Sequence, residues 1–256
     1  LSLRRQRQMC IRDRVYQIPV ASRVAKGRPL INLINLDEGE RITSLLNVES
    51  FEEPGFVFMA TKKGVVKKTS LDEFKRQWKV GKKAIKLDPD DELVGSTLTD
   101  GEKFIMLVSQ SGKAVFFDEK EARSMGRAAR GVKGINLGKD DQVISLLVPE
   151  KENTIFTVSE NGYGKRTNVD DFRKTRRGAK GVIAMQTSDR NGLLIGANQV
   201  TEDQEIMLIS NKGTLVRTKV DQINVIGRNT QGVTVIKLKD SEKLVGLASI
   251  IEDTDD

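Results

Sequence analysis

One pattern recurs through this chain at an almost constant interval: an arginine, three further residues, a glycine, and then a short run of alternating apolar residues. It starts at Arg23, Arg127, Arg177 and Arg228, and a fifth copy, QWKVGKKAIKL, has Gln77 in place of the arginine. The five glycines are 54, 50, 50 and 51 residues apart. We call these segments box loops; they comprise residues 23–27, 77–81, 127–131, 177–181 and 228–232. Such a period indicates one structural unit repeated five times.

Paired apolar runs follow the same period. The two runs of each pair are separated by a residue-plus-glycine dipeptide, of which Asn161-Gly162 is the strongest turn signal. Glycine supplies the positive φ that a two-residue hairpin turn needs, so the pairs predict β-hairpins. The expected hairpins span residues 56–69, 104–117, 154–167 and 205–218. A further predicted strand precedes each hairpin and a last one closes the chain, at residues 41–48, 92–99, 142–149, 193–200 and 243–250.

These elements predict the fold class. With the strand that follows each box glycine, every repeat has about four short strands and no convincing helix. A period near 50 residues with four strands per unit is typical of an all-β, propeller-like array of about five four-stranded blades. The alternative is a β-sandwich with fortuitous hairpins, which has no reason to repeat its loops in phase.

Composition narrows the function classes. The chain is 38% hydrophobic and 31% charged, as is ordinary for a soluble protein, and no apolar run approaches a membrane span. The single cysteine excludes a disulfide framework and fits a reducing cytoplasm. The chain has no histidine, the usual general base and commonest metal ligand, and no phosphate-binding GxxxxGK[ST] loop. We therefore expect no catalytic residue, no metal site and no cofactor in this chain.

The two ends of the chain differ from the repeats. Residues 1–14, LSLRRQRQMCIRDR, show neither strand alternation nor a turn, and QMCIRDR resembles a translated sequencing adapter, so we interpret this segment as a non-native leader. The natural sequence would then begin at Val15. Residues 252–256 form an acidic tail. The body between them, residues 15–251, has a net charge of +7, so it is basic in its own right.

The positive charge is concentrated at equivalent positions of the repeats, namely at the box loops and just after the hairpin turns. In a disc of equivalent blades these positions come to one rim, which suggests a polyanion that follows it. Lysine and arginine bind phosphates without reading sequence, and the scarcity of aromatic residues, 5%, favours duplex DNA over a single strand. The candidate DNA-binding residues are Arg23, Lys26, Arg28, Lys67, Lys68, Lys79, Lys82, Lys83, Arg127, Arg130, Lys133, Lys165, Arg166, Arg176, Arg177, Lys180, Arg217 and Arg228.

The box loops, together with NGYGKRT, RNTQGV, FMATKKGVVKKT and ASRVAKGRP, resemble the C-terminal domain of the DNA gyrase A subunit from Val15 to about Ile251. The resemblance implies a β-pinwheel, a propeller variant whose blades exchange strands, which wraps duplex DNA around its rim. It also implies an A2B2 enzyme, in the cytoplasm at the nucleoid, that introduces negative supercoils with ATP and Mg. The ATPase would lie in the B subunit, the catalytic tyrosine in the N-terminal part of the A subunit; both are outside this chain.

The chain departs from that family at one motif. The family's heptapeptide, Gln-[Arg/Lys]-Arg-Gly-Gly-Lys-Gly, is absent, and the nearest segment is TRRGAKG, Thr175 to Gly181. We expect the chain to carry blades two to six of a six-blade domain, and to bind DNA without complete wrapping. Two alternatives stay open: the related domain of the topoisomerase IV A subunit, and a propeller that serves as a protein-interaction platform.

Overall fold

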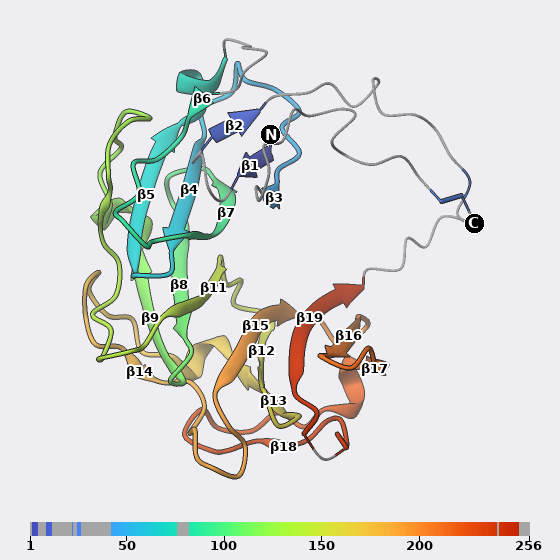
Figure 1. Cartoon of the computed structure of the whole chain (residues 1–256). Helices are drawn as coiled ribbons and strands as arrows, with labels where there is room; N and C mark the ends of the chain where they lie inside the picture. The colour runs from blue at the N-terminus through green and yellow to red at the C-terminus, as the bar shows by residue number, and fades with distance from the viewer. Residues whose placement is uncertain are drawn as a thin grey trace.

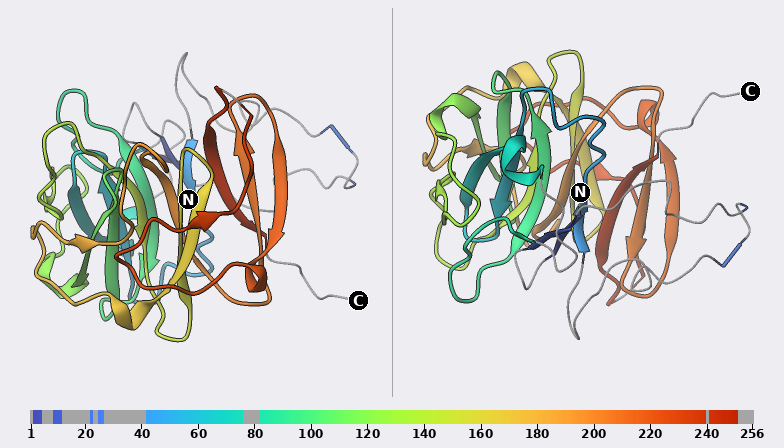
Figure 2. Two further views of the ribbon diagram at one scale, coloured as in Figure 1. Left: turned by 90° about the horizontal axis from the view of Figure 1, so that it is seen from below. Right: turned by 90° about the horizontal axis from the view of Figure 1, so that it is seen from above.

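The computed structural model describes residues 2–4, 9–11, 22, 25–26, 42–75, 82–239 and 241–250. The described chain forms five antiparallel sheets, four of four strands and one of three. They follow one another around an arc in chain order (Figure 1), and Figure 2 shows the same arrangement from below and above. In strand order they are sheet A (β3-β1-β2-β6), sheet B (β10-β5-β4-β7), sheet C (β11-β8-β9-β14), sheet D (β15-β12-β13-β18) and sheet E (β17-β16-β19).

The strands are short, and among the described residues the helical elements are single 3-10 turns after the second hairpin strands of sheets B to E. The strands are β1 (Ser2–Arg4), β2 (Met9–Ile11), β3 (Ile42–Leu45), β4 (Phe56–Thr61), β5 (Val65–Ser70), β6 (Lys82–Lys83), β7 (Leu93–Thr99), β8 (Phe104–Ser109), β9 (Lys113–Asp118), β10 (Val132–Lys133), β11 (Val143–Leu147), β12 (Thr154–Ser159), β13 (Tyr163–Asn168), β14 (Val182–Ile183), β15 (Leu194–Val200), β16 (Glu205–Ser210), β17 (Leu215–Lys219), β18 (Val233–Thr234) and β19 (Leu244–Ile250). The turns are η3 (Leu71–Phe74), η4 (Glu119–Glu121), η5 (Val169–Asp171) and η6 (Val220–Gln222).

The four predicted hairpins are confirmed. They are the pairs β4–β5, β8–β9, β12–β13 and β16–β17, and each turn glycine has a positive φ between 78° and 84°. A positive φ is unfavourable for a residue that carries a Cβ atom, which explains why glycine recurs at this position. The predicted fold class, an all-β array of about five blades, is therefore confirmed.

Each sheet takes strands from two repeats. The strand predicted before a hairpin pairs with the hairpin that precedes it in the chain: β7 pairs with β4, and β15 pairs with β12. The strand after a box glycine pairs with the same earlier hairpin, as β10 does with β5 and β18 with β13. This exchange is the β-pinwheel arrangement, and it ties consecutive repeats together. Sheet E has no fourth strand among the described residues.

The hydrophobic cores lie between consecutive sheets. Ile105 and Leu107 of β8 pack with Phe58 of sheet B, whereas Met106 and Val108 of the same strand pack with Ile155 of sheet D. Successive side chains of a strand point to opposite faces, and here both faces are covered, so β8 is apolar at every position from 105 to 108. Each inner sheet therefore contributes to two cores.

The structure differs from the sequence analysis at the beginning of the chain. Residues 1–14 showed no strand pattern, but β1 and β2 lie within them and pair with each other, and β3 and β6 complete the sheet. The pairing uses backbone groups, which every residue type offers, so it needs no alternation of apolar side chains. Whether the segment is native stays a prediction. The acidic tail, 252–256, lies outside the described residues.

Candidate nucleic-acid interface

The box loops are joined in series through the segment that follows each box glycine. The amide of Lys86, five residues after the box glycine at position 81, donates to the carbonyl oxygen of Ala129 in the next box loop at 3.1 Å. The equivalent bonds are Asn136 N to Ala179 O at 2.9 Å and Gln186 N to Thr230 O at 2.9 Å. We call the box loops 127–131, 177–181 and 228–232, with the strands β6, β10, β14 and β18, the belt. Figure 1 shows β6, β14 and β18 at the outside of the arc, so the expectation that equivalent loops share one rim is confirmed.

The box glycines let each loop lie against the neighbouring sheet. Gly131, Gly181 and Gly232 have φ values of 104°, 78° and 77°, and their backbones contact the strands with which the belt strands pair. A Cβ atom on Gly181 would lie 2.4 Å from the carbonyl oxygen of Ala114 in β9. The recurrence of glycine in the box pattern is therefore explained by backbone packing.

The arginine that opens each box reaches back along the belt. Arg127 Nη1 donates to the carbonyl of Lys83 at 3.4 Å, and Arg228 Nη1 donates to that of Ile183 at 3.1 Å. Arg177 donates in the same way to the carbonyl of Lys133. All three side chains are half-buried. Each box arginine thus links its loop to the belt strand one repeat earlier.

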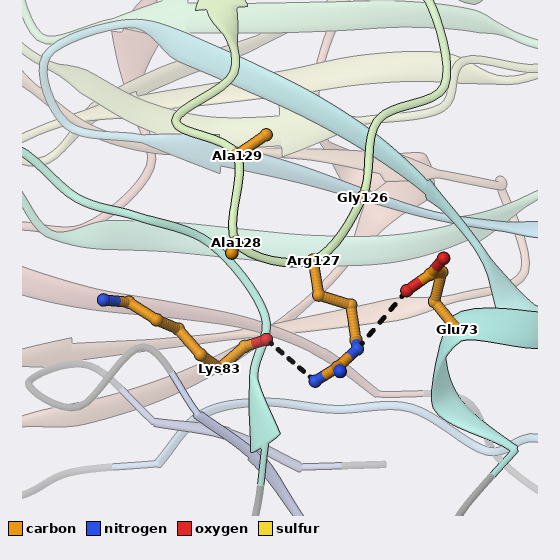
Figure 3. Close-up of a pocket in the computed structure, with 6 residues that line it drawn as sticks. All are labelled: Glu73, Lys83, Gly126, Arg127, Ala128 and Ala129. Carbon is orange, nitrogen blue, oxygen red and sulfur yellow. Dashed lines mark hydrogen bonds and ion pairs between the residues drawn. The ribbon is translucent and has the colours of Figure 1, made fainter.

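A shallow hollow surrounds the first of these links. It is lined by Glu73, Lys83 and the box loop from Gly126 to Ala129. Figure 3 shows the guanidinium of Arg127 between the Glu73 carboxylate, at 3.5 Å, and the carbonyl oxygen of Lys83. The hollow holds an arginine that is already paired, and its shape gives no sign of a small-molecule site.

Several predicted DNA contacts have exposed side chains on the belt. Lys83 in β6, Lys133 in β10, and Arg176 and Lys180 at the box loop 177–181 are exposed. Arg130 is exposed too, and its guanidinium pairs with the Asp88 carboxylate. Positive charge therefore faces solvent on the belt from β6 to the box loop 177–181, whereas the only cation of the box loop 228–232 is the half-buried Arg228.

Two further predicted residues are exposed elsewhere. Lys26 lies in the short described segment 25–26, and Arg217 lies on β17, where it pairs with Glu205. Arg217 belongs to sheet E, which carries no box loop among the described residues.

Four predicted DNA contacts are in fact buried: Lys67, Lys68, Lys165 and Arg166. The Lys68 ammonium donates to the Glu119 carbonyl at 3.0 Å, and Arg166 Nε donates to the Ile223 carbonyl at 2.7 Å. Both faces of β5 and β13 are covered, on one side by the box loop of the next repeat and on the other by the segment around the 3-10 turn of the next sheet, so no alternation brings these residues to solvent. Their charges are satisfied inside the protein, as buried charges must be, and they do not face a phosphate.

The remaining predictions fall where the structure gives no placement. Arg23, Arg28 and Lys79 lie outside the described residues, as does the side chain of Lys82. Sequence reasoning also missed two candidates, Lys86 and Lys237. Both are exposed and stand five residues after a box glycine. At this position the backbone amide of Lys86 binds the next box loop. The constant spacing from the box glycine was the sequence signal that could have identified both lysines.

No group of three or more metal-ligating side chains comes together in the described part of the chain. No described helix has the length and apolar character needed to cross a membrane.

Comparison with known proteins decides the family. The model of the DNA gyrase C-terminal domain, described as a β-propeller, matches five successive segments: 9–49, 55–100, 103–150, 153–201 and 204–251. The chain belongs to the DNA gyrase C-terminal domain family. The five matches correspond to the five repeats, and the first begins inside the segment interpreted as a leader.

Relatives agree with this family. The chain is 50% identical to the DNA gyrase A subunit of Escherichia coli strain K12 over 243 residues, which are 95% of this chain and 28% of that protein. It is 57% identical to the DNA gyrase A subunit of Buchnera aphidicola from Acyrthosiphon pisum over 239 residues, 93% of this chain and 29% of that protein. The chain thus spans less than a third of the length of these relatives.

Solved structures share the fold. A DNA gyrase A C-terminal domain superposes with a TM-score of 0.83 at 25% identity. The match covers 98% of this chain and 81% of the gyrase structure. The C-terminal domain of a DNA topoisomerase IV superposes with a TM-score of 0.82 at 29% identity, covering 88% and 70%. The β-pinwheel of the gyrase family is therefore the architecture of this chain.

Proposed function

We propose that this chain binds duplex DNA along the belt. The observation that carries the proposal is the series of bonds between consecutive box loops, which arranges Lys83, Lys133 and Lys180 along one continuous surface. Exposed cations in successive repeats on one surface suit the phosphate backbone, which lysine and arginine bind without reading sequence.

Duplex DNA that follows the belt has to bend. Bending 20–30 base pairs by 40–90° costs on the order of 1–6 kcal/mol, which phosphate contacts along the curve have to offset. A belt that repeats its exposed cations in each box region supplies contacts over the length of the bend. The same contacts do not depend on base identity, so the binding is expected to be largely independent of sequence.

Membership of the gyrase family gives this binding its context. We propose that the chain is the DNA-wrapping part of the A polypeptide of a bacterial gyrase, which is a type II topoisomerase. It works with the rest of that polypeptide and with the B polypeptide in an A2B2 enzyme at the nucleoid. Its role is to wrap DNA during ATP-dependent negative supercoiling. The catalytic tyrosine, ATP hydrolysis and Mg belong to the other parts of that enzyme, so the chain itself needs no cofactor.

The corresponding domain of topoisomerase IV is the less supported alternative. It superposes almost as well, but the relatives that are 50% and 57% identical both come from DNA gyrase. Topoisomerase IV would predict DNA binding without strong wrapping.

The proposal is tested by DNA binding across a salt series, with the linking number of a relaxed circle measured after ligation in the bound state. We expect tighter binding to duplex than to single-stranded DNA, a steep loss of affinity with salt, and a shifted linking number. Binding without a linking-number shift would fit the topoisomerase IV alternative, and also the expectation that a gyrase chain without the family's heptapeptide wraps DNA incompletely. Affinity that does not depend on salt would refute phosphate binding by the belt.

A further inference from the structure

Two buried lysines hold the belt from inside the sheets. Lys67 in β5 and Lys165 in β13 both stand three residues after a hairpin glycine, and both have 0% of their surface exposed. The Lys67 ammonium donates to the carbonyl of Ala84 at 2.6 Å and to that of Arg127. The Lys165 ammonium donates to Gly227 O at 2.8 Å, to Arg228 O and to Thr230 Oγ1 at 3.2 Å. The two lysines therefore make equivalent contacts in two different blades.

The shared acceptor is informative. In both blades the ammonium binds the backbone carbonyl of the arginine that opens a box loop, Arg127 in one and Arg228 in the other. That loop belongs to the next repeat and lies across the sheet, where backbone bonds such as Met125 N to Lys68 O at 2.9 Å also hold it. An ammonium offers three protons, and both lysines donate theirs to neutral oxygen atoms rather than to a carboxylate. Lys67 binds the box loop and the segment after β6, and Lys165 binds residues 227–230. The contact therefore sets the height and tilt of the box loop over the sheet.

Sheet C shows that the fold itself does not require a lysine here. The equivalent residue in β9 is Val115, which is fully buried in an apolar core. The box loop over sheet C keeps the backbone bond that the other two loops also make, here Thr175 N to Phe116 O at 2.7 Å, and is held in addition by Arg177 N to Glu121 Oε2 at 2.8 Å. A buried ammonium is costly where an apolar residue also serves, so its presence in sheets B and D calls for a reason beyond packing.

We propose that Lys67 and Lys165 are positioning residues for DNA binding: each fixes the box loop of the next repeat, and thereby the place where that loop presents its arginine. The inference rests on the proposed DNA-binding function of the belt. Neither lysine touches DNA in this account, because both are enclosed by the loop they hold.

The electrostatics give a signature that packing alone would not produce. Burial, followed by the positive charge of Arg127, lowers the pKa of Lys67 to about 8, while Glu73 acts in the opposite direction. Burial and Arg228 likewise lower the pKa of Lys165 to about 8, against Asp171. A phosphate beside either arginine offsets its positive charge and so raises the pKa of the lysine beneath it. DNA binding should therefore take up protons at a pH near 8.

Proton uptake is measured on the unaltered chain by calorimetry of duplex binding at pH 8, in two buffers with different ionisation enthalpies. We expect uptake at pH 8 that disappears at pH 6.5, where both lysines are already protonated. The K67R/K165R variant keeps both charges without titrating near pH 8, so it should bind DNA and lose the uptake. DNA binding by the unaltered chain with no uptake at pH 8 would overturn the inference.

A double-mutant cycle tests the mechanism. Lys67→Met keeps the aliphatic stem and removes the donor, and we expect it to weaken DNA binding about fivefold to tenfold. If Lys67 acts through the loop, Arg127→Ala should have a smaller effect in the K67M background than alone. Lys151→Met is the control, because it removes an exposed positive charge at the end of β12 away from the hairpin turn.

The outcomes separate the two proposals. A purely structural lysine would lower the unfolding midpoint of K67M and leave the DNA affinity of the folded variant unchanged, which would refute the inference alone. Additive effects of K67M and R127A would refute it as well. If the unaltered chain itself does not bind duplex DNA, the proposed function fails first. If K67M does not fold, the proton measurement on the unaltered chain decides.

Discussion

At the scale of single residues, the role of a cation depends on its position within the repeat and on what covers that position. In sheets B and D a cation three or four residues after a hairpin glycine is buried, as in Lys67 and Arg166. Arg217 has the same position in sheet E and is exposed, and so is Lys133, two residues after a box glycine. The sequence analysis recognised that the charge recurs but not that these classes differ. Lys67 is buried by the box loop at Arg127, which lies 60 residues further along the chain. No local sequence pattern predicts such a contact.

The lowered pKa values predict how stability changes with pH. Below about pH 8 Lys67 and Lys165 are protonated in both the folded and the unfolded chain. Between about 8 and the ordinary lysine value of 10.5, the unfolded chain keeps protons that the folded chain has lost, so the free energy of unfolding rises with pH. We expect this rise in urea denaturation between pH 7.5 and 10. It should be smaller in the K67M/K165M variant, and an equal rise in both proteins would contradict the buried positions of these ammonium groups.

At the scale of elements, the strands and turns follow from the sequence, but their partners do not. Alternating apolar runs around Asn161-Gly162 predict a hairpin, and β12–β13 is that hairpin. The same reasoning placed the strand 92–99 before the hairpin 104–117, yet β7 pairs with β4 of the preceding repeat. A strand such as β7 could pair with the hairpin of its own repeat or with that of the preceding repeat, about 50 residues away. Because the repeats resemble one another, no local signal indicates which hairpin it joins. The belt geometry depends on this choice.

The hairpin glycines test the element scale. A Cβ atom on Gly112 would lie 2.1 Å from the Met185 carbonyl oxygen, at a φ of 83°. We expect Gly112→Ala to lower the free energy of unfolding by about 3 kcal/mol, because it combines an unfavourable φ with a backbone clash. Gly213→Ala is the matched control: its φ is 84° but nothing lies within 4 Å, so its cost should be about 1–2 kcal/mol. Equal losses of unfolding free energy in urea denaturation would contradict the close contact between the Gly112 turn and the backbone at Met185.

At the scale of the whole molecule, the repeats build one continuous surface. Cores between consecutive sheets and bonds between consecutive box loops join each blade to the next, so the positive positions of separate repeats form the belt. The five-fold period was enough to predict this common rim. The period could not show that Arg127, Arg177 and Arg228 donate hydrogen bonds to the belt itself. Their acceptors are carbonyl groups of the preceding repeat, which no local pattern identifies.

The most direct test of the central claim compares two pairs of lysine substitutions in one salt series of duplex binding. Lys133→Ala with Lys180→Ala removes two exposed charges from the belt, and Lys103→Ala with Lys151→Ala removes two exposed charges at the ends of β8 and β12 away from the hairpin turns. If the belt binds phosphates, the belt pair should weaken binding and reduce the slope of log affinity against log salt by about 2, roughly one for each lost contact. The control pair should leave the slope nearly unchanged. Equal slopes for the belt pair and the unaltered chain, or a larger change for the control pair, would contradict the account.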